Sequence, residues 1–213
     1  MNHQWIDLTM PIEAGMPTWP DNPGVSLVPS QCLAHGDVCN VSELKMGTHT
    51  GTHIDGLNHF IKGAPAIEEM PLELMTGVVE VIEIEDPKQI TQAELEKHVL
   101  KKDGRYFFKT RNSPELHGKP EFDGGFVHIA EDAAKHLAAC EVALIGVDYL
   151  SVGGFEGNVI EVHQALLGNG IWCVEGLDLR EVSAGRYETV VAPLKLVGSD
   201  GGAARVLARK ETA

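Results

Sequence analysis

Three histidines and an aspartate lie within eleven residues of this chain, in the segment His49-Thr-Gly-Thr-His-Ile-Asp-Gly-Leu-Asn-His59. His49, His53, Asp55 and His59 are separated by even numbers of residues. In extended chain such residues project from one face, whereas a helix would point Asp55 and His59 away from the two earlier histidines. Two imidazoles and a carboxylate converging from one segment are typical ligands of a zinc-like or manganese-like cation. The spacing therefore predicts a metal site on extended chain rather than a histidine-rich surface loop.

The composition is that of an ordinary globular protein. The 213 residues are 43% hydrophobic and 23% charged, enough for one sizeable core. We expect a cytoplasmic protein, because the N-terminus does not resemble a signal peptide and the four cysteines form no CxxC pair or disulfide framework. No apolar stretch approaches the ~18 residues of a membrane span. The net charge of −14 disfavours nucleic acid and anionic lipid as partners.

Hydrophobic patterning predicts the elements that must position these side chains. Runs rich in β-branched or apolar residues predict strands at 5–12, 25–28, 41–46, 78–84, 105–109, 142–147, 171–174, 186–197 and 204–208. Helices are expected at 91–100, 131–139 and 158–167, and loops at 16–24 and 111–125. Strand and helix alternate in the second half. We therefore expect one mixed α/β domain over residues 1–213, with a parallel element in its second half.

Further metal ligands would have to come from the second half of the chain. Asp148 and Glu175 each follow a predicted buried strand, and such strand ends often carry the site of an α/β sheet. His163 lies in the helix between them. Each also has an ordinary structural explanation: Asp148 as a turn former, Glu175 paired with a cation such as Arg180, and His163 covering the core. Spacing alone does not choose among them.

Beyond these spacings, the segment followed by Phe60 resembles the HxGTHxDxxxHF signature of the putative-cyclase superfamily, which contains the bacterial kynurenine formamidases and the isatin hydrolases. The resemblance extends from about residue 5 to 209. It includes four later stretches in the family's order, which are Gly146-Val-Asp-Tyr-Leu-Ser-Val152, His163-Gln-Ala-Leu-Leu167, Val174-Glu-Gly-Leu177 and Pro193-Leu-Lys-Leu196.

The resemblance implies a fold and a set of roles. The fold would be a mixed α/β domain with a barrel-like, partly parallel sheet flanked by short helices, of the swivelling β/β/α type, in a homodimer. His59 would be the catalytic histidine. One or two divalent ions, zinc first and manganese as the alternative, would be held by His49, His53, Asp55, His163 and Glu175.

The implied reaction is hydrolysis of an amide C–N bond, with N-formylkynurenine giving kynurenine and formate. His59 would accept a proton from water and return one to the leaving nitrogen. No G-x-S-x-G elbow is present, so a serine nucleophile is not expected. The alternatives are opening of a cyclic amide such as isatin, and a metal-dependent binding protein without catalysis, against which His59 argues.

Two features of the sequence bear on which small-molecule amide is the substrate. Trp19, in a proline-rich loop, is either an aromatic contact for the substrate or a cover for the edge of the core. Gly56-Leu57 stands where many relatives have Ala-Pro, beside the expected pocket. This departure affects the choice of substrate more than the choice of chemistry.

Overall fold

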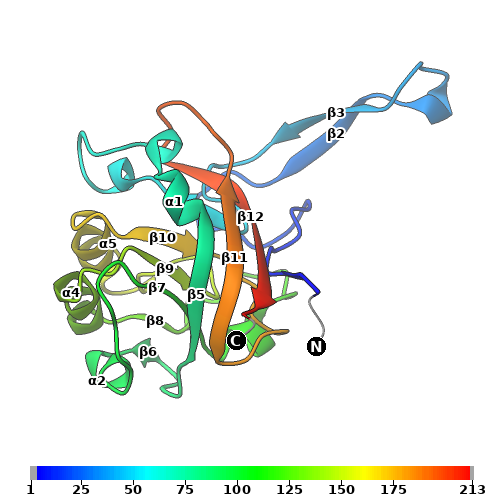
Figure 1. The fold of residues 1–213 in the computed structure, drawn as a ribbon. Helices are drawn as coiled ribbons and strands as arrows, with labels where there is room; N and C mark the ends of the chain where they lie inside the picture. Colours follow the sequence, from blue (N-terminus) through cyan, green and yellow to red (C-terminus); the bar gives the residue numbers. More distant parts are fainter. Residues whose placement is uncertain (1–3, 212–213) are drawn as a thin grey trace.

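The computed structural model describes residues 4–211, and a closed barrel of seven strands forms its centre (Figure 1). Around the barrel the strand order is β12, β11, β5, β7, β9, β10 and β4, and β4 pairs again with β12 to close it. A short strand β1 adds to the free part of the β12 edge. The strands are β1 (Ile6–Asp7), β4 (His53–Asp55), β5 (Thr76–Glu83), β7 (Arg105–Lys109), β9 (Leu144–Val147), β10 (Trp172–Glu175), β11 (Gly185–Pro193) and β12 (Gly201–Lys210).

Three of the seven strand pairs of the barrel are parallel and four are antiparallel. The pairs β5–β7, β7–β9 and β9–β10 are parallel, while β10–β4, β4–β12, β12–β11 and β11–β5 are antiparallel. This confirms the expected mixed α/β fold with a partly parallel, barrel-like sheet. Because the short strand β4 lies between β10 and β12, the histidine-rich segment is joined directly to two strands from the far end of the chain.

Short helices cover the outside of the parallel half. Helices α4 (Glu131–Ala139) and α5 (Val159–Leu167) pack against each other, and α5 also contacts β10. Figure 1 shows α5, α4 and α2 stacked along this side of the barrel. The remaining helices are α1 (Leu72–Met75), α2 (Gln92–Leu95) and α3 (Asn112–Leu116), with 3₁₀ turns η1 (Leu33–His35), η2 (Leu57–His59) and η3 (Ile67–Glu69) and a small parallel pair β6 (Gln89–Ile90) and β8 (His128–Ile129).

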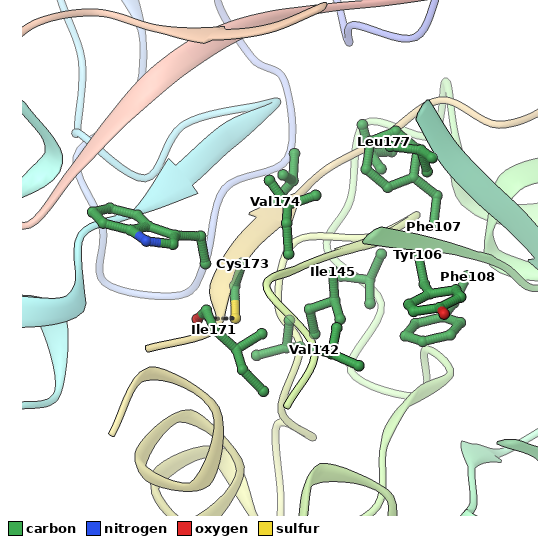
Figure 2. Packing of buried hydrophobic residues seen from close by; sticks show 14 of the residues in the cluster. Tyr106, Phe107, Phe108, Val142, Ile145, Ile171, Cys173, Val174 and Leu177 are labelled. Atoms are coloured by element: carbon green, nitrogen blue, oxygen red, sulfur yellow. Dashed lines mark hydrogen bonds between the residues drawn. The ribbon is translucent and has the colours of Figure 1, made fainter. Parts of the chain in front are cut away.

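All residues of β9 and β10 are buried, as expected for strands covered on both faces. Figure 2 shows Ile145, Val174 and Leu177 among the apolar side chains gathered around these strands. Gly146 is required by this packing, because a Cβ there would lie 2.5 Å from side-chain carbons of both Leu177 and Phe107. The part of the barrel that carries the site described below is therefore tightly packed.

Three predicted elements differ in the structure. The strand expected at 5–12 is reduced to β1 and a single bridge at Thr9, because the N–H groups of Thr9 and Met10 donate to the side chains of Asp7 and Thr52 and Pro11 has no N–H to donate. The helix expected at 91–100 ends at Leu95. The loop expected at 111–125 contains α3, which accommodates Pro114 in its first turn, where the missing backbone N–H costs nothing.

The other predicted strands and helices are present within a few residues of their expected bounds. Residues 16–24 form a loop without helix or strand, as expected. The four cysteines are free. Within residues 4–211, no helix has the length and apolar character needed to span a membrane.

One hairpin leaves the barrel altogether. Strands β2 (Ser26–Gln31) and β3 (Val41–Lys45) pair with each other and project away from the rest of the molecule (Figure 1). We call this hairpin, residues 26–45, the arm.

Candidate active site

Strand β4 brings the first two residues of the site together. His53 and Asp55 are two residues apart on a strand, so their side chains share one face, and both are buried. The register of the β10–β4 pair places Glu175 directly opposite His53. Directly opposed residues share a face, and Nε2 of His53 lies 3.2 Å from Oε2 of Glu175. Strand pairing therefore joins side chains that are far apart in the sequence.

Helix α5 supplies the second buried histidine. Nε2 of His163 lies 3.4 Å from Oε1 of Glu175 and 3.7 Å from Oδ2 of Asp55. Its other ring nitrogen, Nδ1, donates to the backbone carbonyl of Val159 at 2.6 Å. His53 is held in the same way, with Nδ1 against the carbonyl of Gly51 at 2.9 Å. A backbone partner on Nδ1 orients each ring and aims Nε2 at the carboxylates, as it does in ligand histidines.

His49 and His59 complete the cluster from either side of β4. Nδ1 of His49 lies 2.9 Å from Oδ1 of Asp55, and the His49 ring stacks on that of His59 with centroids 4.0 Å apart. His49 is about one-seventh exposed, and His59 is partly buried. All four histidines and both carboxylates thus form one group, in which the ring of His59 also meets that of His163 edge-on.

The expectation that extended chain carries all four side chains is wrong, although the side chains do converge. Only His53–Asp55 is strand; His49 lies in a turn and His59 ends the 3₁₀ turn η2. Gly51 adopts φ of +62°, a left-handed conformation that ends the extended chain before β4. The four residues therefore gather because the chain bends around the site.

The charges of the cluster compensate one another. Burial alone would lower the pKa of His53, but contact with Glu175 and the charges of Glu175 and Asp55 outweigh it and raise the pKa to about 9. Burial would also lower the pKa of His163, but contact with Glu175 and the charges of Glu175 and Asp55 outweigh burial and raise this pKa. Burial would raise the pKa of Glu175, yet contacts with His163 and His53 hold it well below its usual range. The buried carboxylate of Glu175 is thus kept ionised by positive charge beside it.

A divalent cation meets this requirement better than two protons do. Nε2 of His49, Nε2 of His53 and Oδ2 of Asp55 are buried without a well-formed hydrogen bond, which is costly for polar atoms. Two sets of ligand atoms each lie within 4.8 Å of one another, one from His49, Asp55 and His59 and the other from His53, Asp55 and Glu175. Imidazole nitrogens with carboxylate oxygens are the donors that zinc and manganese accept. The residues therefore fit a cation site, with Asp55 common to both sets.

The structure distinguishes among the three candidate ligands from the second half of the chain, Asp148, His163 and Glu175. Asp148 is buried, but its carboxylate accepts hydrogen bonds from the backbone of Thr110 and Ser113 and belongs to neither set of ligand atoms. Arg180 pairs with Asp178 at 2.7 Å, so the proposed pairing of Glu175 with Arg180 is wrong. Of the three candidates, His163 and Glu175 reach the cluster and Asp148 does not.

A cavity of about 220 Å³ opens beside the cluster. It is lined by Trp19, Asn22, His49, His59, Phe60, Leu150, Ser151, Val159, His163 and Glu175. Trp19 packs edge-on against Phe122 and Phe155, with ring centroids 5.4 and 5.3 Å away. Trp19 thus packs against a second, smaller cluster of buried apolar residues and also lines the cavity. Its position is therefore compatible with both roles considered from the sequence, substrate contact and cover for the edge of the core.

Sequence reasoning missed Asp200, which holds the histidine-rich segment in place through Thr48 and Gly56. Its carboxylate accepts a hydrogen bond from the hydroxyl of Thr48 at 2.9 Å, and its backbone carbonyl accepts one from Gly56 N–H at 2.8 Å. A Cβ at Gly56 would lie 3.1 Å from that carbonyl and 2.5 Å from the side chain of Asn58, which favours glycine here over alanine. The only signal for Asp200 was its place in a Ser-Asp-Gly-Gly turn.

Comparison with known proteins gives a consistent set of relatives. The model of the putative cyclase family matches residues 6–153. The kynurenine formamidase of Bacillus cereus (strain ATCC 10987 / NRS 248) is 32% identical over 207 residues, which cover 97% of each chain. Cyclase-like protein 3 of Oryza sativa subsp. japonica is 33% identical over 212 residues, covering 95% of this chain and 78% of the rice protein.

Solved structures agree with these relatives. The predicted metal-dependent hydrolase from Bacillus stearothermophilus superimposes with a TM-score of 0.85 at 31% identity, covering 98% of each chain. Isatin hydrolase A from Labrenzia aggregata, bound to benzyl benzoate, gives a TM-score of 0.85 at 20% identity, covering 98% of this chain and 94% of that one. At 20% identity, the similarity to isatin hydrolase A shows a shared fold and nothing more.

Proposed function

The chain belongs to the putative cyclase family, and we propose that it is a metal-dependent amidohydrolase that cleaves aryl formamides, with N-formylkynurenine as its first candidate substrate. One observation carries this proposal: two buried carboxylates and three imidazoles form one cluster, and its members His49, His163 and Glu175 line a cavity that also presents His59 and Trp19. Relatives named kynurenine formamidase and metal-dependent hydrolase, at 31–32% identity over nearly the whole chain, support the same activity. We propose that residues 1–213 form this one hydrolase domain.

We assign the metal to His49, His53, Asp55, His163 and Glu175. Zinc is the first choice and manganese the alternative, since both accept nitrogen and carboxylate donors. The two sets of ligand atoms that share Asp55 would suit either one ion or a pair. When bound, the cation would polarise the amide carbonyl and make water a stronger acid at neutral pH.

His59 is proposed as the proton-transfer group. Burial lowers its pKa and, with a smaller contribution from the charges of His49 and His163, outweighs the opposing charges of Asp55 and Glu175. A neutral imidazole is therefore available at neutral pH to take a proton from the attacking water. As water adds to the formyl carbon and the C–N bond breaks, the same ring returns the proton to the leaving nitrogen. The products are the free arylamine and formate.

Trp19 is proposed as an aromatic contact of the substrate ring. Its indole lines the cavity together with Phe60, whose own ring stacks on His163 with centroids 4.3 Å apart. Two aromatic walls next to the metal ligands favour a flat substrate ring. This arrangement suits an aryl amide of either the open or the cyclic kind.

Two further proposals concern assembly and location. We propose a homodimer, as the resemblance to the cyclase superfamily implies, and a cytoplasmic location, which four free cysteines support. The acidic net charge of −14 supports a small molecule rather than a nucleic acid as the partner of the site.

The test of the function is a substrate panel with metal content measured on the same samples. Protein loaded with Zn²⁺ or Mn²⁺ is expected to release kynurenine and formate from N-formylkynurenine, with a kcat/KM at least ~10² above that for isatin, because discrimination between related substrates by pocket contacts reaches that size. Chelator-treated protein should be inactive and recover on readdition of metal.

Two other outcomes would assign a different function to the protein. Faster turnover of isatin would make the protein a cyclic amide hydrolase. Binding of N-formylkynurenine without turnover, at full metal content, would make it a metal-dependent binding protein.

A further inference from the structure

The segment that follows β9 borders the cavity, although it supplies neither a proposed metal ligand nor the proton-transfer group. Its residue Ser151 lines the cavity. The next peptide, that of Val152, donates its N–H to Oε1 of Glu175 at 2.7 Å. The same oxygen lies 3.4 Å from Nε2 of His163. Ser151 is therefore joined to the proposed metal ligands by a single peptide unit.

Ser151 carries a hydroxyl group whose hydrogen atom has no acceptor in the protein. The residue is only 5% exposed, and its Oγ accepts a hydrogen bond from the N–H of Gly153 at 3.2 Å. Within residues 4–211, no carbonyl or side chain accepts a hydrogen bond from this hydroxyl in return. A buried hydroxyl normally donates as well as accepts, because an unpaired buried donor is costly. The hydrogen atom is therefore available to a molecule in the cavity.

The surroundings of Ser151 restrict which group of a substrate can accept this hydrogen bond. The buried polar side chains of the cavity lining are Ser151, His163 and Glu175, and the last two are assigned to the metal. Ser151 is thus the buried polar side chain of the lining that remains for the substrate. A lone hydroxyl brings no charge to compensate a buried carboxylate, so a neutral carbonyl oxygen is the acceptor that suits it.

We propose that the hydroxyl of Ser151 donates a hydrogen bond to a carbonyl oxygen on the substrate ring, ortho to the amide nitrogen whose bond is cleaved. This inference rests on the proposed function and narrows its substrate class to anilides with an acyl group at the ortho position. Covalent geometry keeps the oxygen of an ortho acyl group beside the amide nitrogen, where a donor next to the metal ligands can reach it. Both N-formylkynurenine and isatin carry a carbonyl group at this position.

A hydroxyl next to the metal ligands could instead donate to the oxyanion that forms at the formyl carbon. The proposed metal already polarises the amide carbonyl, which leaves Ser151 for the carbonyl group on the ring. The two roles differ in their dependence on the substrate. An oxyanion forms during hydrolysis of every formanilide, whereas the contact with a ring carbonyl exists only in an ortho-acyl substrate.

Two isomeric substrates test the contact. N-(2-acetylphenyl)formamide and N-(4-acetylphenyl)formamide both carry an electron-withdrawing acetyl group, but only the 2-isomer places its carbonyl beside the amide. With metal-loaded protein, Ser151→Ala is expected to lower the ratio of kcat/KM for the 2-isomer to kcat/KM for the 4-isomer by ~10–10², because the buried ring carbonyl loses its partner. Metal content is measured on the same samples and should equal that of the wild type.

Ser113→Ala is the matched control. Ser113 is also buried, and its Oγ likewise accepts one backbone N–H, that of Leu179, at 3.2 Å. It does not line the cavity. Its replacement removes an equivalent buried acceptor and should leave the ratio for the two isomers at the wild-type value.

Binding of the two product amines gives the same comparison without turnover. Calorimetry on metal-loaded wild type is expected to show tighter binding of 2-aminoacetophenone than of 4-aminoacetophenone, and Ser151→Ala should lose this preference. If no formamide is hydrolysed, the proposed function fails, and the binding comparison alone decides the role of Ser151. Equal losses of kcat/KM for both isomers, an unchanged ratio, or a wild type without preference between the amines would each overturn the proposal.

Discussion

Replacing His53 with alanine is expected to remove most of the divalent metal from the protein and to abolish hydrolysis with it. His53 is fully buried, its ring is oriented by Gly51, and its Nε2 lies 3.2 Å from Glu175 and 3.6 Å from Asp55. Removing a residue that only hydrogen-bonds to a ligand typically lowers metal affinity by ~10–100-fold. Removing a ligand itself should therefore lower metal affinity by more than ~10². Metal content by mass spectrometry of the purified variant, with affinity by chelator competition, measures the effect.

The matched control for this variant is His136→Ala. His136 lies in the last turn of α4, outside both sets of ligand atoms. Its replacement should leave metal content and turnover unchanged. If His53→Ala instead kept the wild-type stoichiometry and affinity, His53 would not be a ligand, and the assignment of β4 as the metal-binding strand would fail.

Replacing His59 with alanine is expected to leave metal and fold in place but to lower kcat by ~10²–10⁴, the usual contribution of a positioned acid–base group. His59 lines the cavity and stacks on His49, and its lowered pKa keeps it neutral and able to accept a proton. Steady-state kinetics on N-formylkynurenine at constant metal content measure the loss. Added imidazole should restore part of the rate, because a small base can occupy the space left by the ring.

His59→Ala also decides between two roles that the geometry admits. The ring nitrogen of His59 lies within 4.8 Å of ligand atoms of His49 and Asp55, a set that could itself hold an ion. Loss of metal from His59→Ala would make His59 a ligand and leave the proton transfer to another group. Retained metal with unchanged kcat would remove His59 from the mechanism.

Much of the fold was predictable because its strands carry local signals. The apolar run at 142–147 and the β-branched run at 78–84 correspond to β9 and β5 within two residues. Closure of the barrel was not predictable from such signals. It depends on β4, a strand of three residues, pairing with both β10 and β12, and no local pattern encodes partners over a hundred residues away.

The residues of the site were likewise predictable from the sequence only in part. The histidines and aspartate of the 49–59 segment were identified from composition and spacing, although their convergence comes from a bend at Gly51 rather than from one strand. Spacing did not distinguish His163 and Glu175 from Asp148; the resemblance to a known family selected them. The structure places them at the cluster through the register of β10 against β4 and the position of α5. Asp200 gave no chemical signal in the sequence, since its role depends on contacts with Thr48 and Gly56.

The central claim is that a divalent cation lies between β4, β10 and α5, bound directly by residues from both halves of the chain. Crystals grown with Zn²⁺, with diffraction recorded on both sides of the zinc absorption edge, locate the ion most directly. We predict an anomalous peak ~2.0–2.2 Å from Nε2 of His53 and from a carboxylate oxygen of Asp55 or Glu175. A zinc peak more than ~3 Å from all of His49, His53, Asp55, His163 and Glu175 would contradict the account, since such distances exclude direct ligation.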